Sequence, residues 1–253
     1  MTGRLTIVGL GPGDPRWLTP AASEALASAT DLVGYAAYIA RVPEAPGQRR
    51  HASDNRVELD RARFALDLAA RGRRVAVVSG GDPGVFAMAA AVFEAIEGGD
   101  ADWRKLDIRV EPGITAMLAA AARVGAPLGG DFCAMSLSDN LKPWEVVEAR
   151  LRAALHADFV VALYNPISHA RPWQLGAALS IVGDVRTPDT PIILARAVGR
   201  PDERIAILAL SEVEPSSADM STIVIIGAST SRRIDREGRV PFVYTPRSYK
   251  VSP

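Results

Sequence analysis

The stretch LTIVGLGPGDPRWLT, residues 5–19, joins an apolar, β-branched run to a loop of glycine and proline. The run predicts a strand buried on both faces, and the loop ends that strand. The same order of strand, glycine-rich loop and helix recurs in VVSGGDPGVF, residues 77–86, and in VEPGITAM, residues 110–117. Because the carboxyl ends of parallel strands share one edge of a sheet, we expect the three loops to converge on a ligand-binding edge.

The first loop does not have the residues of a phosphate site. In a dinucleotide fingerprint the third glycine opens the helix whose free N–H groups bind pyrophosphate, but Asp14 occupies that position here. Pro12 and Pro15 supply no amide hydrogen, and the stretch lacks the Gly-Lys-Ser/Thr signature of a P-loop. The edge suits a ligand that backbone groups recognise through its amine, carboxylate, ribose and purine edges. Asp14 either acts on that ligand or caps a turn.

Strand-like and helix-like runs alternate along most of the chain, which predicts an α/β fold. In the first half this alternation favours a mainly parallel sheet. After Pro191 the runs PIILARAV, RIAILALSEV and STIVIIG follow one another without a helix of ordinary length, which favours antiparallel additions to a mixed sheet. Glycine and proline between residues 112 and 130 mark a boundary, so we predict two α/β domains, 1–112 and 113–253. The polar tail from Arg232 is expected to be exposed.

Composition narrows the classes of function. The chain has 253 residues, of which 48% are hydrophobic, and its 29 basic residues balance 29 acidic ones, so neither nucleic acid nor a membrane surface is an expected partner. The single cysteine, Cys133, excludes a disulfide framework and a cysteine metal cluster, and no metal-ligand spacing is present. With no apolar run long enough to span a membrane, we expect a cytoplasmic protein. Arginine outnumbers lysine by 26 to 3, which fits either a polycarboxylate ligand or a composition bias.

A set of motifs, in order along the whole chain, resembles the tetrapyrrole methylases, which use S-adenosylmethionine to methylate porphyrinoid intermediates. The motifs are VGLGPGDPRWLT, SGGDPGVF, PGITA, LYNP and DMSTIVIIG. Within the family, VGYAAYIARV and YNPISHARPWQL resemble the branch that methylates precorrin-3B at C17 and contracts its ring to give precorrin-4 in aerobic cobalamin synthesis. The resemblance implies two α/β domains, a homodimer, and both the cofactor and a tetrapyrrole substrate in the cleft between the domains.

The resemblance also implies which residues bind S-adenosylmethionine, leaving S-adenosylhomocysteine as the product. The methionine part and ribose would be held mainly by backbone groups of the first domain's loops, and the adenosine by the second domain. The implied residues are Pro12, Gly80, Gly81, Asp82, Val85, Thr115, Ala116, Asn165, Ala197, Ser221 and Thr222. This chain departs from its relatives at Asn165, where they often carry Met, and at Ser221 and Thr222, where they often carry Pro-Ala.

The chemistry implied by the resemblance requires alignment more than a nucleophile, because the methyl group moves by backside displacement. Ring contraction also needs a proton acceptor and a donor, and we expect Asp14 to do acid/base or substrate-orienting work. Tyr35 and Tyr38 lie three residues apart, so we place both on one helical face, either against the macrocycle or in the core. His169 and Arg171 are alternative substrate residues, able to orient a propionate or take a proton.

Three other interpretations stay open at this point. One is the cobalt-containing, oxygen-independent counterpart, cobalt-precorrin-3 C17-methylation, or another precorrin methylase. Another is a nicotinamide-dependent oxidoreductase, which requires a ribose-binding acid at the carboxyl end of the second strand, whereas Asp31 stands at the other end. The third is a tetrapyrrole carrier without activity, for which three glycine turns around a cofactor cleft would have no use.

Overall fold

The computed structural model describes residues 3–54, 57–168 and 170–248. The chain divides into two compact units, Met1–Thr115 and Ala116–Pro253. Our sequence-based division, between residues 112 and 113, falls in the turn just before this point.

The first unit is built on a five-stranded sheet in the order β3-β2-β4-β1-β5, in which every neighbouring pair is parallel. The predicted parallel sheet is confirmed. Its neighbouring strands β4, β1 and β5 are formed by the three apolar runs from which strands were predicted. The sequence analysis recognised β2 as the strand that Asp31 begins, and it missed β3. The strands are β1 (Arg4–Gly9), β2 (Asp31–Tyr35), β3 (Arg49–Ser53), β4 (Arg74–Ser79) and β5 (Asp107–Glu111).

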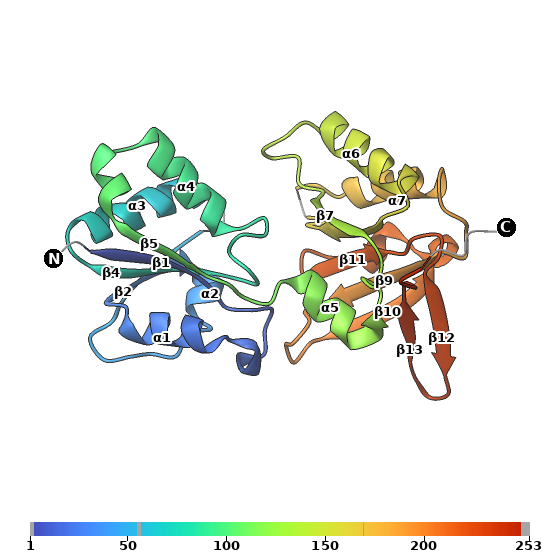
Figure 1. The fold of residues 1–253 in the computed structure, drawn as a ribbon, viewed down its shortest axis with the longest axis horizontal. Coiled ribbons are helices and arrows are strands. Elements are labelled where there is room, and N and C mark those ends of the chain that lie inside the picture. Colours follow the sequence, from blue (N-terminus) through green and yellow to red (C-terminus); the bar gives the residue numbers. More distant parts are fainter. Residues whose placement is uncertain (1–2, 55–56, 169, 249–253) are drawn as a thin grey trace. The chain divides into compact units, whose positions relative to one another are not determined.

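Helices cover both faces of this sheet, with α3 and α4 on one face and α1 and α2 on the other (Figure 1). Side chains alternate along β1, so Leu5 and Ile7 pack in the core under α3 and α4 while Val8 packs with α1. Burial on both faces explains the unbroken apolar run of the sequence. The helices are α1 (Pro20–Ser28), α2 (Ala36–Ile39), α3 (Glu58–Ala70) and α4 (Met88–Gly98), with 3₁₀ turns η1 (Pro15–Trp17) and η2 (Ala101–Lys105).

The second unit contains a mixed five-stranded sheet in the order β10-β9-β11-β8-β7. β7 and β8 are parallel, and β9, β10 and β11 join by antiparallel pairing, so the predicted mixed sheet is confirmed. The helices α6 and α7 pack on one face of this sheet (Figure 1). The elements are α5 (Ala116–Val124), β7 (Phe132–Ser136), α6 (Trp144–His156), β8 (Val160–Tyr164), α7 (Gln174–Gly183), β9 (Pro191–Arg196), β10 (Arg204–Ala209), η3 (Leu210–Glu212), η4 (Pro215–Ser217) and β11 (Thr222–Ile226).

A small third sheet, in the order β12-β13-β6, lies in the same unit and was not predicted. Over residues 232–248 the polar tail is mostly exposed, with Val243 and Thr245 buried, and it is also regular. β12 (Arg232–Arg236) and β13 (Arg239–Tyr244) form an antiparallel hairpin, and β6 (Gly125–Ala126) pairs with β13 in parallel. The Arg236 guanidinium stacks 3.6 Å from the ring centre of Phe242, which holds the two strands together on their exposed face.

Candidate functional site

Three loops meet at the carboxyl edge of the first sheet, as their strands β1, β4 and β5 are neighbours. The first two loops are joined by a backbone bridge. Gly11 N donates to Gly81 O at 3.1 Å, and Gly81 N donates to Gly11 O at 2.9 Å. The convergence predicted from the sequence is therefore present in the fold, and it is made by main-chain groups.

The third loop approaches the other two so closely that only glycine fits. A Cβ atom on Gly113 would lie 2.2 Å from Gly81 O, and a Cβ atom on Gly9 would lie 2.7 Å from Gly113 N. Both contacts are with backbone, which cannot rotate away as a side chain does. The three loops therefore pack as one unit.

Asp82 fixes the conformation of this unit through both of its carboxylate oxygens. Oδ1 accepts a hydrogen bond from Gly84 N at 2.8 Å, and Oδ2 accepts one from Gly113 N at 3.0 Å. The carboxylate thus ties the second loop to the third, and we call these two hydrogen bonds the Asp82 clamp. Of the residues predicted to bind the cofactor here, Pro12, Gly80, Gly81, Val85 and Thr115 lie on these same loops.

Asp14 lies at the end of the first loop as the N-cap of the 3₁₀ turn η1. Its Oδ1 accepts a hydrogen bond from Arg16 N at 2.9 Å, and its Oδ2 pairs with Arg16 Nη2 at 2.6 Å. The side chain of Arg16 is 86% exposed, so this ion pair faces solvent and contributes little to stability. The capping role weighed at the sequence level is observed, and the acid/base role stays a prediction.

Tyr35 and Tyr38 do not share a helical face, so that part of the prediction is wrong. Tyr35 is the last residue of β2 and precedes the four-residue helix α2, which contains Tyr38. The strand extends to Tyr35 because β2 pairs with β3 along its whole length. The two rings nevertheless pack edge to face, with centroids 5.4 Å apart. Tyr38 also lies over Gly80, where a Cβ atom would be 2.7 Å from its ring.

Arg41 was missed by sequence analysis although it contacts the first loop directly. Its Nη2 donates to Leu10 O at 3.1 Å and to Gly11 O at 2.9 Å. The residue follows α2, and no sequence pattern marks it, because a carbonyl-binding arginine looks like any other in an arginine-rich chain. Its role is to hold the first loop in place.

In the second unit, Asn165 follows β8 with a backbone φ of 51° and donates from Nδ2 to Ser136 Oγ at 2.9 Å. Asparagine tolerates this left-handed conformation better than most residues, which gives a physical reason for the departure from the family pattern. Beside it, Tyr164 Oη accepts from Met117 N at 3.1 Å, at the start of α5. Ala116 is the first residue of that helix.

The loops after β9 and before β11 form a second polar cluster. Ala197 N donates to Ser221 O at 2.9 Å, and Ala197 has a φ of 49°, which is strained for alanine. Asp219, which sequence analysis missed, accepts from Ser221 N and from Thr222 Oγ1 and pairs with Arg196 at 2.6 Å. Burial acts to raise the pKa of Asp219, but hydrogen bonds from Arg196, Thr222 and the Ser221 backbone outweigh it and lower that pKa.

Of the predicted substrate residues in this unit, Arg171 donates from Nη1 to Ser138 Oγ at 2.8 Å. It is therefore tied to the loop that follows β7. His169 lies outside the described residues. The predicted site residues thus fall into two groups, one in each unit.

The residues of both groups fit the expected S-adenosylmethionine. The first group offers backbone N–H and C=O groups, and its nearby arginine, Arg41, is engaged with carbonyl oxygens. The second offers neutral amide and hydroxyl side chains, at Asn165, Ser221 and Thr222. Such groups suit the ammonium, carboxylate, ribose and purine of a sulfonium nucleoside and do not form a polyphosphate site.

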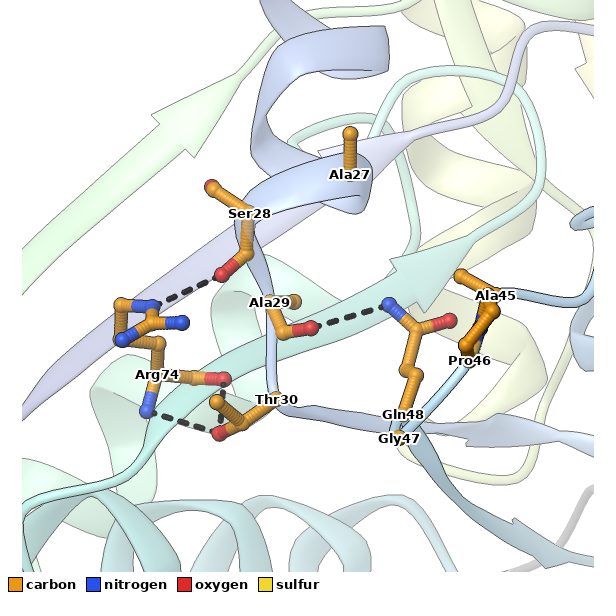
Figure 2. A pocket seen from close by; sticks show the side chains of 9 residues that line it. All are labelled: Ala27, Ser28, Ala29, Thr30, Ala45, Pro46, Gly47, Gln48 and Arg74. Atoms are coloured by element: carbon orange, nitrogen blue, oxygen red, sulfur yellow. Dashed lines mark hydrogen bonds between the residues drawn. The ribbon is translucent and has the colours of Figure 1, made fainter.

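A hollow of about 440 Å³ lies elsewhere, at the amino end of the first sheet, and none of the predicted site residues lines it (Figure 2). Its polar side chains serve the end of α1: Gln48 Nε2 donates to the carbonyls of Leu26 and Ala29, and Arg74 Nε donates to Ser28 O. These contacts satisfy carbonyls that a helix end leaves without intrahelical partners. The hollow is a structural feature of the helix end.

Asp31 begins β2 at this same amino edge and is fully buried. Its carboxylate pairs with Arg73 at 2.7 Å and His51 at 3.0 Å. Burial acts to raise the pKa of Asp31, but hydrogen bonds from Arg73, His51 and Thr30 outweigh it and lower that pKa. An acid at this end of the strand is not placed to bind a nicotinamide ribose, which argues against the oxidoreductase interpretation.

Comparison with known proteins identifies the family. The family model of the Tetrapyrrole (Corrin/Porphyrin) Methylases matches residues 4–214, most of the chain. The chain belongs to the tetrapyrrole methylases. Its membership accounts for the glycine-rich edge of the first unit and confirms the resemblance seen in the motifs.

Two curated relatives cover the chain almost completely. The chain is 57% identical over 249 residues to a precorrin-3B C(17)-methyltransferase of Sinorhizobium sp, covering 98% of both proteins. It is 36% identical to a probable cobalt-factor III C(17)-methyltransferase of Salmonella typhimurium, covering 98% of this chain and 100% of that protein. Of these two relatives, the precorrin-3B C(17)-methyltransferase therefore has the higher sequence identity to the chain.

Solved structures give the same fold. The crystal structure of the methyltransferase CobJ has a TM-score of 0.92 and 52% identity, covering 96% of this chain and 100% of that one. A uroporphyrin-III C-methyltransferase from Thermus thermophilus, complexed with S-adenyl homocysteine, has a TM-score of 0.65 and 24% identity, covering 89% and 97%. The predicted fold class of two α/β units, parallel in the first and mixed in the second, is confirmed.

Two further observations concern the described residues alone. None of their helices is both long and apolar enough to cross a membrane. Across residues 3–54, 57–168 and 170–248, no three His, Cys, Asp or Glu side chains are grouped so that they could hold a metal ion.

Proposed function

We propose that this methyltransferase transfers a methyl group from S-adenosylmethionine to C17 of precorrin-3B and contracts the ring, giving precorrin-4 in aerobic cobalamin synthesis. The observation that carries the proposal is the 57% identity, over 98% of both chains, to a precorrin-3B C(17)-methyltransferase. We further propose that it works in the cytoplasm as a homodimer, with domains 1–112 and 113–253 each supplying residues that bind the two substrates.

The bound cofactor supplies an electrophilic methyl group. The chain's own task is to hold the two reactants in line and exclude water. The Gly11–Gly81 bridge and the Asp82 clamp keep the first unit's loops rigid for that purpose, with Pro12, Gly80, Gly81, Val85 and Thr115 as backbone contacts. In the second unit, Ala116, Asn165, Ala197, Ser221 and Thr222 would enclose the adenosine.

Contraction adds a proton transfer. The substrate gains a methyl cation, its bridging carbinol becomes a carbonyl as a ring C–C bond migrates, and the hydroxyl proton leaves, so the charge balances. Asp14 is our candidate to accept or orient that proton, and Tyr35 and Tyr38 are candidates to stack on or hydrogen-bond to the macrocycle. Arg171 and His169 would orient a carboxylate side chain.

The test is incubation of purified protein with S-adenosylmethionine and metal-free, hydroxylated precorrin-3B, followed by mass spectrometry and absorption spectroscopy. Gain of one methyl group with a changed chromophore supports methylation and contraction, and Asp14→Asn should then methylate without contracting. No methyl gain, together with turnover of the cobalt-containing analogue, would favour the alternative of cobalt-precorrin-3 C17-methylation. The name of the Salmonella relative, a probable cobalt-factor III C(17)-methyltransferase, describes a similar activity. Binding without any product would favour a carrier, and light scattering in solution tests the homodimer.

A further inference from the structure

The loops that follow β7 and β8 lie at the same edge of the second sheet, because these strands are parallel neighbours. Between them they present two cations. Lys142 Nζ donates to Ser136 O at 2.9 Å, and Arg171 Nη1 donates to Ser138 Oγ at 2.8 Å. Ser136 and Ser138 are only two residues apart, so both cations bind the same short segment at the end of β7, whose length is at most about 7 Å.

Both cations have N–H groups that make no hydrogen bond within the described residues. One N–H of the Lys142 ammonium donates to Ser136 O, and the other two have no acceptor among those residues. Arg171 Nη2 likewise has no acceptor among them. The side chain of Arg171 is only 19% exposed, so its position is set by packing. Fixed donors with unused hydrogen-bonding capacity are what a carboxylate requires.

The charge around Lys142 also favours an anion. Asp139 is the acid placed beside both cations, 3.7 Å from Arg171 Nε, and Arg150 adds a further positive charge near Lys142. Burial, and to a lesser extent Arg150, lower the pKa of Lys142, whereas Asp139 acts to raise it. Three cations beside one carboxylate leave a net positive potential at this edge.

Two buried acceptor atoms mark the same place. Gln174, the first residue of α7, is 1% exposed and donates from Nε2 to Asp139 Oδ2 at 3.1 Å, but its Oε1 has no hydrogen-bond partner. Asp139 Oδ1 likewise lacks a hydrogen-bond donor. Buried acceptors are normally satisfied, so these two oxygens are placed to accept hydrogen bonds from a bound ligand or from its hydration water.

Two exposed apolar side chains are neighbours in sequence of the residues described above. Leu141, directly before Lys142, is 97% exposed, and Trp173, directly before Gln174, is 48% exposed and packs edge to face on Trp144 at 4.8 Å. An exposed leucine and an indole beside fixed cations suit a ligand with an apolar ring and peripheral carboxylates. A tetrapyrrole with acetate and propionate side chains has this chemistry.

We propose that the loops after β7 and β8 form a binding site for one edge of the tetrapyrrole, in which Lys142 and Arg171 hold a peripheral carboxylate and Leu141 and Trp173 contact the ring. This inference rests on the proposed function for the identity of the substrate. It assigns a role to Lys142, Leu141 and Trp173, three residues to which the sequence analysis gave none.

The test uses two readouts: the KM for precorrin-3B, and the Kd for uroporphyrin III, a stable tetrapyrrole polycarboxylate, from quenching of tryptophan fluorescence. Lys142→Gln and Arg171→Gln should each raise both constants about tenfold, the usual effect of losing one charge-assisted hydrogen bond. Lys142→Arg should recover most of the affinity, because it keeps the charge. Lys105→Gln, a lysine exposed on the first unit, is the matched control and should leave both constants unchanged.

A second pair of variants avoids any effect on folding, as Leu141 is almost fully exposed. Leu141→Glu should weaken binding of uroporphyrin III severalfold by repelling its carboxylates, and Leu141→Lys should preserve or strengthen it. If both Leu141 variants and folded Lys142→Gln bind and turn over like wild type, the inference is wrong. If wild-type protein binds uroporphyrin III with these charge effects but does not methylate precorrin-3B, the proposed function is wrong and the binding site stands.

Discussion

Replacing Gly113 by alanine should disrupt the joint packing of the three loops at the carboxyl edge of the first sheet. The new Cβ atom would lie 2.2 Å from Gly81 O, whereas real Cβ atoms keep at least 3.0 Å from such an atom. Gly81 O must therefore retreat by the difference between these distances, about 0.8 Å. That oxygen accepts from Gly11 N, and Gly113 N donates to Asp82, so both hydrogen bonds are lost or strained.

The cost follows from these contacts. Two hydrogen bonds at about 1 kcal/mol each, with about 1–3 kcal/mol for overpacking, give a loss of about 3–5 kcal/mol in the free energy of unfolding. For a protein of this size the loss corresponds to a fall in Tm on the order of 10 °C. Binding of S-adenosylmethionine should weaken more than stability alone explains, because the displaced groups are those proposed to contact it.

Thermal unfolding followed by circular dichroism, with isothermal titration of S-adenosylmethionine, measures both effects. Gly98→Ala is the matched control: it lies at the end of α4, no atom stands within 4 Å of its Cβ position, and it should be neutral or slightly stabilising. A Gly113→Ala protein with wild-type Tm and wild-type cofactor affinity would refute the idea that the three loops form one packed unit.

Three other predictions concern separate parts of the chain. Asp31→Asn should lower the free energy of unfolding by about 1–3 kcal/mol at pH 7, because the partly exposed Arg73 guanidinium loses its ion pair with the buried carboxylate. Since the pKa of Asp31 is lowered on folding, the stability that its carboxylate contributes is present above about pH 4 and is lost as the pH falls through the folded pKa. In urea titrations from pH 7 to acid, the free energy of unfolding should therefore change less with pH in the variant than in wild type. Gly80→Ala should destabilise the protein by displacing the Tyr38 ring, and the loss should be smaller in a Tyr38→Ala background; equal losses in both backgrounds would argue against that contact. Because the pKa of Lys142 is lowered, its side chain loses its charge at a lower pH than an ordinary lysine does. The KM for precorrin-3B should therefore rise as the pH is made alkaline, and in Lys142→Arg the same rise should occur only at a higher pH.

The strands that sequence analysis found are those whose signal is local. β1 and β4 are buried on both faces, β1 ends at Gly9 and β4 is followed directly by Gly80, so their composition identifies them. β3 was missed because its sequence, RRHAS, is polar, and it is a strand only because β2 supplies hydrogen-bond partners at the sheet edge. The β12–β13 hairpin did carry a local signal: Glu237 and Gly238 form the turn, and Gly238 has a φ of 63°.

In the candidate site, too, some features could be predicted from the local sequence and others depend on residues far apart in the chain. The glycine-rich loops could be predicted to converge, because strand order places their ends together. The partners of individual side chains could not, since Arg41 reaches across about 30 residues to Leu10 and Gly11, and Asp82 reaches Gly113 across a similar interval. Tyr35 was assigned to a helix because spacing alone does not reveal where a neighbouring strand stops pairing.

The Asp82 clamp affects the rate at which a ligand binds to the first unit's loops. Both carboxylate oxygens are already bonded within the protein, so the loop has its final shape before a ligand arrives. Little chain entropy is then lost when the ligand docks. Association with the first unit's loops should therefore proceed in a single fast phase, without the slow, concentration-independent step that loop ordering would add.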